Sequence, residues 1–137
     1  MFLFDVDGTL TPSRQKMDKE FSKFFSNFCK NNDVYLVTGS DRDKTVEQLG
    51  KTLYNKVKRV YNCSGNSVWE KNKNVHTSEW NCPCVLSSYL ELELNASKFK
   101  TKTGKHIEER PGCINFSILT STYHRSYLPN RKRRRNL

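Results

Sequence analysis

The chain has 137 residues and a formal net charge of +10 at pH 7, and only 35% of its residues are hydrophobic. This length suits one ordinary domain, or one domain and part of a second, with a modest core. Eight phenylalanines and six tyrosines argue against a disordered chain. No apolar run approaches the length of a membrane span, and the N-terminal residues lack the basic start of a signal sequence. We therefore expect a cytoplasmic protein without membrane contact.

The excess of positive charge is concentrated near the C-terminal end. No acidic residue follows Arg110, whereas six basic residues lie between positions 125 and 135. Because a run of like charges is usually solvated, we predict a disordered basic tail over residues 121–137. The five cysteines form no CxxC pair and lack the spacing of a zinc site, so free thiols in a reducing compartment are expected.

The chain opens on an apolar strand that ends in two acidic residues. Residues 2–4 are predicted to form a short buried strand, and Asp5 and Asp7 follow it at a spacing that places both carboxylates on one side. Gly8 then lets the backbone turn sharply. Two acids and a glycine after a strand also fit an ordinary Asx-type turn, so the pair alone leaves both interpretations open.

Alternating helices and strands are predicted next. The first helix has an apolar stripe at helical spacing, assigned to the core: Met17, Phe21, Phe24, Phe25 and Phe28. Residues 34–37 form a second buried strand, which completes a right-handed βαβ unit. The second helix has Ser40 and Asp41 as N-cap candidates and an apolar face of Val46, Leu49 and Leu53. Ser40 is either a simple cap or a hydroxyl that binds an anion beside the two acids.

The rest of the chain is rich in hairpins. Further strands are predicted at residues 59–63, 67–70, 75–79, 105–110 and 113–119. Between the third and fourth of these, residues 81–84 mark a hinge and residues 86–94 an amphipathic helix. The fold class is therefore α/β. We predict a Rossmann-like core over residues 1–80, a partial α+β cap domain over residues 81–120, and the basic tail.

The two acids suit phosphoryl transfer. Asp5 would attack phosphorus as a nucleophile, and Asp7 would exchange a proton with the leaving and incoming oxygens. Two carboxylates beside a phosphate repel one another, so the site needs a cation, and Mg²⁺ binds both kinds of oxygen. Ser40 would hold a phosphate oxygen. Arg14 would pair with phosphate or substrate, although composition alone slightly favours a surface arginine at a helix start.

Residues 5–11, Asp-Val-Asp-Gly-Thr-Leu-Thr, resemble the nucleophile motif of the haloacid dehalogenase superfamily of phosphotransferases. Several further stretches resemble the eukaryotic-type phosphomannomutase family, and the resemblance spans residues 2 to about 119. These stretches are Thr-Pro-Ser-Arg-Gln-Lys at 11–16, Gly-Ser-Asp at 39–41, Glu-Gln-Leu-Gly at 47–50, Ile-Glu-Glu-Arg at 107–110 and Asn-Phe-Ser at 115–117.

The resemblance implies interconversion of mannose 6-phosphate and mannose 1-phosphate through an aspartyl-phosphate, for GDP-mannose synthesis. It also implies Mg²⁺, a sugar bisphosphate activator, a hexose phosphate substrate, a Rossmann-like haloacid dehalogenase core with a cap, and a homodimer formed through the cap. By the match, Asp5 is the nucleophile and Asp7 the proton donor and acceptor. Both contact the metal, Asp7 through its backbone carbonyl. Arg14 and Arg110 bind substrate, Arg110 from the cap.

The resemblance ends near Leu119, where the composition changes abruptly. We interpret this change as the mark of a truncated or frame-shifted product that lacks the rest of the cap and the closing acidic metal ligands. Two alternatives stay open. A sugar-phosphate phosphatase of the same superfamily would pass the phosphoryl group to water. An inactive fragment with a nucleic-acid-binding tail is less favoured, since the basic run has no interleaved aromatic residues.

Overall fold

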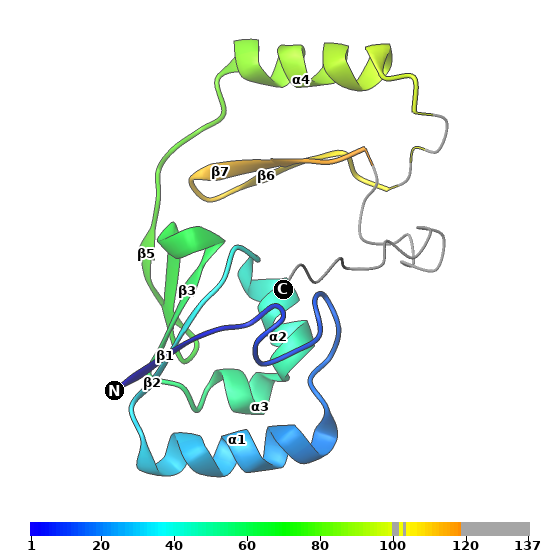
Figure 1. The fold of residues 1–137 in the computed structure, drawn as a ribbon. Helices are drawn as coiled ribbons and strands as arrows, with labels where there is room; N and C mark the ends of the chain where they lie inside the picture. Colours follow the sequence, from blue (N-terminus) through cyan, green and yellow to red (C-terminus); the bar gives the residue numbers. More distant parts are fainter. Residues whose placement is uncertain (100–101, 103, 119–137) are drawn as a thin grey trace, which may run out of the picture.

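The computed structural model of the chain describes residues 1–99, 102 and 104–118. These residues form a five-stranded sheet associated with helices, and a separate two-stranded hairpin beside one further helix (Figure 1). The predicted tail at residues 121–137 lies outside the described residues.

The sheet combines a parallel half and an antiparallel half. In spatial order its strands are β1 (Phe2–Asp5), β2 (Val34–Val37), β3 (Arg59–Asn62), β4 (Ser67–Glu70) and β5 (Lys73–Thr77). The first three strands run parallel, and β4 and β5 form an antiparallel hairpin. The connecting helices are α1 (Lys19–Asn31), α2 (Arg42–Leu49), α3 (Lys51–Tyr54) and the 3₁₀ turn η1 (Cys63–Gly65). Parallel strands joined through helices confirm the predicted α/β class.

The core lies between the parallel strands and helices α1 to α3. Its fully buried members come from both layers and include Leu36 on β2, Val60 on β3 and Tyr54 on α3. Trp69 on β4 packs against the same cluster. Burial of these side chains supplies most of the force that holds the sheet to its helices.

Helix α1 buries a narrower face than predicted. The side chain of Phe25 is 3% exposed, whereas that of Phe24 is 65% exposed. Successive residues of a helix point about 100° apart, so a single face cannot hold both rings. Met17 is buried, but it lies ahead of the helix, which begins after the N-cap Asp18. The prediction of a core stripe was therefore wrong for Phe24, and also for Phe21, which is 37% exposed.

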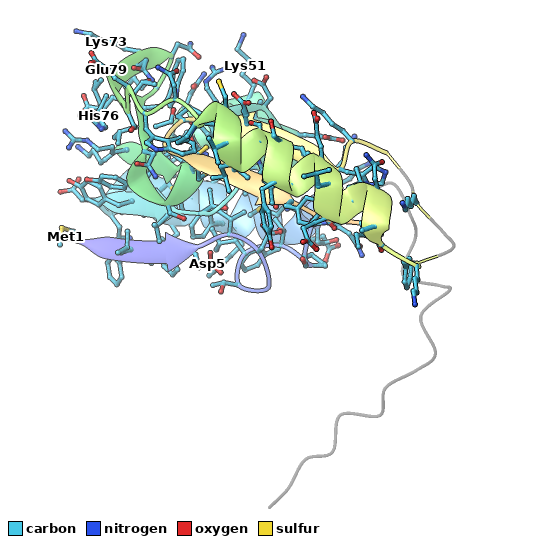
Figure 2. The ribbon with its side chains drawn as sticks, turned by 90° about the horizontal axis from the view of Figure 1, so that it is seen from above. Met1, Asp5, Lys51, Lys73, His76 and Glu79 are labelled. Atoms are coloured by element: carbon cyan, nitrogen blue, oxygen red, sulfur yellow. The ribbon has the colours of Figure 1, made fainter. Side chains whose placement is uncertain are left out.

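Strand β1 was predicted to be buried, but of its apolar residues only Phe4 is partly buried against the core. Phe2 is 44% exposed and Leu3 61% exposed, because β1 is an edge strand that pairs with β2 alone among the described residues. Met1 and Asp5 mark this margin of the molecule in Figure 2, and Lys73 and His76 mark the hairpin at the other. An apolar run on both faces is typical of a central strand, and this misled the prediction.

The second predicted helix is interrupted. Helix α2 ends at Leu49, and Gly50 adopts φ +80°, a left-handed conformation that favours glycine. Four residues of α3 then follow, so Val46, Leu49 and Leu53 contribute to the core from two short helices. The short helices place the residues after β2 close to those after β1.

The second unit of the chain contains α4 (Cys84–Ala96), β6 (Ile107–Arg110) and β7 (Cys113–Phe116). The two strands form an antiparallel pair, as predicted, and occupy the space between α4 and the sheet (Figure 1). None of the residues of α4 is buried. The domain boundaries at residues 80 and 120 stay a prediction.

Candidate active site

The loop after β1 is closed by hydrogen bonds among its own backbone groups. The amides of Leu10 and Thr11 both donate to the carbonyl of Val6, at 3.0 Å, and the amide of Gly8 donates to that of Thr11, at 2.7 Å. Gly8 has φ +83°, and Arg14 has φ +58°, which is uncommon for a residue with a side chain. Strained backbone of this kind clusters at functional sites, so Arg14 marks the loop as a candidate.

Asp7 is the polar centre of this loop. Its Oδ1 accepts hydrogen bonds from the backbone amide of Arg14, at 2.7 Å, and from Nε2 of Gln48, at 2.8 Å. Its Oδ2 accepts a hydrogen bond from the hydroxyl of Ser40, at 3.4 Å. Donors from the loop, from α2 and from the β2–α2 turn therefore hold one carboxylate. Asp5, two residues earlier, is exposed at the end of β1.

Ser40 turns its hydroxyl toward Asp7, and the cap of α2 is a different residue. The side chain of Asp41 accepts the hydrogen bond of the Lys44 backbone amide, at 2.9 Å, which is the N-cap interaction. Of the two predicted roles for Ser40, the cap is therefore excluded. Its position beside Asp7 fits the predicted anion-binding role, which stays a proposal.

A buried hydrogen-bond network supports the turn that carries Ser40. Asn62, fully buried at the end of β3, accepts a hydrogen bond from the Tyr54 hydroxyl at 2.9 Å and donates one to the Thr45 hydroxyl at 2.8 Å. Thr45 in turn donates to the Asp41 carbonyl at 2.8 Å. Burial raises the pKa of Tyr54 to about 12, so its hydroxyl stays a donor. The network fixes the backbone on which Ser40 sits.

The hairpin β6–β7 meets this end of the sheet through charged side chains. Arg110 donates to the Gly39 carbonyl at 3.3 Å, and its Nε lies 3.8 Å from a carboxylate oxygen of Asp41. Glu108 accepts hydrogen bonds from Lys44 at 2.9 Å and from Arg110 at 2.5 Å. The structure thus brings the predicted Arg110 beside the turn that carries Ser40.

Two close contacts accompany these ion pairs. A Cβ atom on Gly112, at the hairpin turn, would lie 2.2 Å from the side chain of Asn66. Gly112 also has φ +68°, so only glycine fits there. Burial raises the pKa of the Cys63 thiol to about 11, and the neighbouring Cys113 thiol of β7 adds to the rise. The hairpin therefore contacts the loop around η1 as well as α2.

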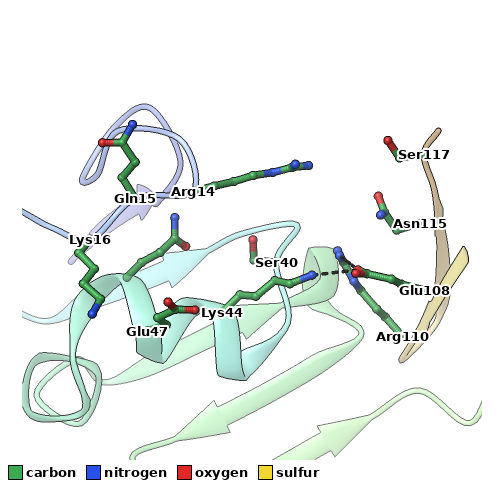
Figure 3. A pocket seen from close by; sticks show the side chains of 11 residues that line it. Arg14, Gln15, Lys16, Ser40, Lys44, Glu47, Glu108, Arg110, Asn115 and Ser117 are labelled. Carbon is green, nitrogen blue, oxygen red and sulfur yellow. Dashed lines mark hydrogen bonds and ion pairs between the residues drawn. The ribbon is translucent and has the colours of Figure 1, made fainter. Parts of the chain in front are cut away.

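These segments enclose a pocket of about 290 Å³ (Figure 3). Its charged lining consists of Arg14, Lys16, Glu47, Lys44, Glu108 and Arg110. Four cations against two carboxylates make the pocket electropositive, as an anionic ligand requires. Ser40 and Gln48 also line it, and both donate hydrogen bonds to Asp7. Neither Asp7 nor Asp5 is itself among the lining residues.

Only Arg14, Ser40 and Arg110 of the lining were predicted as site residues, and three of the missed residues make the contacts described above. Gln48 holds Asp7, receives the amide hydrogen bond of Met17 at 2.8 Å on its carbonyl, and is 7% exposed. Lys44 and Glu108 form the contact between α2 and the hairpin. Gln48 lies next to the apolar Leu49 near the end of α2, a position that could have suggested its burial. Lys44 and Glu108 are 64 residues apart, so no local pattern indicates their contact.

Oxygen donors in this region fit a hard cation. The carboxylates of Asp5, which is exposed, and of Asp7 lie at the end of β1 and in the loop that follows it, and carboxylate oxygens are ligands that Mg²⁺ accepts when phosphate oxygens complete the set. Within the described residues, no group of three or more His, Cys, Asp or Glu side chains is placed to hold a metal ion. The five cysteines are free thiols, as predicted. In the same part of the chain, no helix is both long and apolar enough to cross a membrane.

The site combines an Asp-x-Asp loop after a parallel strand, a serine after the next strand and an electropositive pocket, the arrangement expected from the resemblance to haloacid dehalogenase phosphotransferases. No protein-family model matches the chain. Curated relatives do. A phosphomannomutase of Galdieria sulphuraria is 33% identical over 128 residues, which cover 84% of this chain and 48% of that protein.

Other relatives carry the same name. Phosphomannomutase 1 of Mus musculus is 53% identical over 49 residues, or 36% of this chain and 19% of that one. A phosphomannomutase of Triticum aestivum is 32% identical over 121 residues, or 84% and 49%. The predicted resemblance is confirmed: the chain is homologous to the phosphomannomutases. It spans about half the length of the curated relatives that it matches over most of its own length.

Solved structures give weaker likenesses. An IMP-nucleotidase of Plasmodium falciparum is 16% identical with a TM-score of 0.48, covering 82% of this chain and 38% of that one. A sugar phosphatase of the haloacid dehalogenase superfamily is 17% identical with a TM-score of 0.40, covering 56% and 30%. Because both TM-scores are below 0.5, these structural similarities carry no argument about the fold or the function of this chain.

Proposed function

We propose that this site catalyses phosphoryl transfer on a hexose phosphate, of the phosphomannomutase type, between mannose 6-phosphate and mannose 1-phosphate. The observation that carries the proposal is the meeting of Asp7, Ser40 and Arg110. These residues come from the β1 loop, the β2–α2 turn and the hairpin: Ser40 and Arg110 line one electropositive pocket, and Asp7 accepts the hydrogen bond of the Ser40 hydroxyl. Homology to phosphomannomutases supports the same assignment.

The proposed roles follow from the position of each side chain. Asp5 is exposed at the strand end and would attack phosphorus to form an aspartyl-phosphate. Asp7, held by donors on both of its oxygens, would pass a proton to and from the sugar oxygens. Ser40 would donate a hydrogen bond to a phosphate oxygen.

Arg14 and Arg110 would bind the substrate from opposite walls of the pocket, where the guanidinium of Arg14 extends toward the hairpin (Figure 3). Mg²⁺ would be held by the Asp5 carboxylate and the backbone carbonyl of Asp7. When bound, it would offset the repulsion between the carboxylates and the phosphate. The sugar bisphosphate activator, the homodimer through the cap and the cytoplasmic location belong to the same proposal.

Phosphoryl trapping tests the proposal. The chain is incubated with Mg²⁺ and a ³²P-labelled hexose bisphosphate, and we expect label on the protein that is lost in Asp5→Asn. The matched control is Asp33→Asn, which removes an exposed carboxylate that pairs with Lys58 at 3.1 Å, and should keep the label. Absence of label, or label that persists in Asp5→Asn, would overturn the proposal.

Product analysis then separates transfer to sugar from transfer to water. With mannose 1-phosphate as substrate, the mutase produces mannose 6-phosphate. A phosphatase releases only inorganic phosphate and mannose. Appearance of free phosphate without mannose 6-phosphate would replace the mutase with a phosphatase of the same class.

A further inference from the structure

Glu108 lies where an anion is expected in this pocket. Its Oε2 is 2.9 Å from Nζ of Lys44 and 2.5 Å from Nη2 of Arg110, so a single carboxylate oxygen engages two cations from different segments. Figure 3 shows Glu108 between these two side chains, at the hairpin wall of the pocket. Two cations that converge on one oxygen form the arrangement that proteins use to bind phosphate.

The electrostatics of the three groups agree with this geometry. Hydrogen bonds from Lys44, and then from Arg110, hold the pKa of Glu108 down to about 2, so it is a carboxylate at neutral pH. Its side chain is 23% exposed and that of Lys44 39% exposed. The group is therefore accessible to a ligand that enters the pocket, and it is not sealed within the core.

A phosphate and Glu108 cannot share these cations without cost. A dianion placed between Lys44 and Arg110 would lie next to the carboxylate, and like charges this close repel strongly in a partly desolvated site. Asp41 also lies near both cations, at 3.6 Å from Lys44 and 3.8 Å from Arg110. If Glu108 swings away, Asp41 still retains the two cations at the pocket wall, ready for the ligand.

We propose that Glu108 is an internal competitor for the anion position between Lys44 and Arg110, and that a phosphate ester binds by displacing its carboxylate. This inference rests on the proposed function, because it takes the pocket to be a phosphate site. It adds a specificity-determining residue that the opening Asp-x-Asp motif does not predict. A ligand with two negative charges can replace the carboxylate, whereas a singly charged or neutral sugar cannot.

Phosphate binding by variants of the full chain tests the inference. Affinity for inorganic phosphate is measured by isothermal titration calorimetry. We expect Glu108→Gln to bind roughly tenfold tighter, the equivalent of about one charge-assisted hydrogen bond no longer competed for. The matched control is Glu109→Gln, the exposed neighbour on the same strand, which should leave the affinity unchanged. Lys44→Met should weaken binding in both backgrounds.

A second measurement needs no substitution. In the wild-type chain, the ¹³C resonance of the Glu108 carboxyl group should move when phosphate saturates the site, while that of Glu70 stays in place. An unchanged Glu108 resonance, or equal or weaker binding by Glu108→Gln, would overturn the inference. If Glu108→Gln binds phosphate tightly but no aspartyl-phosphate forms, the proposed function fails and the inference stands. If the aspartyl-phosphate forms but Glu108→Gln binds phosphate with unchanged affinity, the inference fails and the proposed function stands.

Discussion

The sheet with its helices and the hairpin unit are held by different forces. The sheet buries Leu36, Val60 and Tyr54 in a continuous apolar cluster. The hairpin contacts α2 and its N-cap Asp41 through ion pairs of Glu108 and Arg110, besides its close approach to the loop around η1, and α4 buries no residue. Apolar burial gives a firm scaffold, and charged contacts give an attachment that a ligand or a change of pH can alter. The candidate site takes residues from both regions: Asp7 and Ser40 come from the loops of the sheet, and Arg110 comes from the hairpin.

The largest expected effect is a cavity in the scaffold. Leu36→Ala removes a side chain that is 0% exposed, and should lower the free energy of unfolding by about 2–5 kcal/mol. Urea denaturation followed by circular dichroism measures the change. Leu92→Ala, at a residue of α4 that is 67% exposed, serves as control and should change stability by less than about 0.5 kcal/mol. Equal losses of unfolding free energy in Leu36→Ala and Leu92→Ala would show that the two regions do not differ in apolar burial.

A smaller loss is expected from the buried polar network. Asn62→Ala leaves the Tyr54 hydroxyl without its acceptor, which should cost about 1–3 kcal/mol of unfolding free energy. The turn that carries Ser40 should loosen as well, which amide hydrogen exchange at residues 38–41 would detect. Asn72→Ala, in the exposed hairpin turn, is the comparison variant. Unchanged exchange at the turn would show that Asn62 does not support Ser40.

The hairpin contact can be broken without touching a charge. Gly112→Ala places a methyl group against Asn66 and forces a residue with a side chain into φ +68°. We expect hydrogen exchange to rise in β6 and β7 and to stay unchanged in β2. The double variant Gly112→Ala with Asn66→Gly removes the clash and keeps the backbone strain, so it should restore part of the protection. If the double variant recovers no protection, the whole effect of Gly112→Ala comes from the backbone strain.

The subtlest effect is a pH dependence confined to the hairpin. The folded pKa of Glu108, about 2, lies below its ordinary value of 4.5, so its ion pairs stabilise the docked hairpin fully above pH 4.5. That contribution fades as the pH falls from 4.5 toward 2. NMR shifts of residues 107–116 should follow this window in the wild type and not in Glu108→Gln. Simultaneous loss of the β2 signals would mean that the two regions unfold together.

The positions of several elements could be predicted because their signals are local. The strand at residues 34–37 is a β-branched apolar run between turn residues, and β4 begins and ends at the predicted residues 67 and 70. Asp5, Asp7 and Ser40 could be placed at one end of the sheet because the carboxyl ends of parallel strands coincide. Their placement follows from topology alone.

What could not be predicted depends on contacts between distant segments. The exposure of Leu3 depends on which strands lie beside β1, and its own apolar pattern does not contain that information. The pair of Lys44 and Glu108 joins residues 64 positions apart. The role of Gln48 likewise required the position of α2 relative to the β1 loop.

The two margins of the sheet differ in what they offer to another strand. β5 is polar at every position except Val75, with Lys73 at its start, and charged or polar edges discourage pairing. β1 is apolar, and its outer backbone edge has no partner among the described residues. The sheet therefore has a direction of growth: a further strand would add beside β1. Such an addition would shield Leu3 from water and convert the margin next to Asp5 into the middle of a wider sheet.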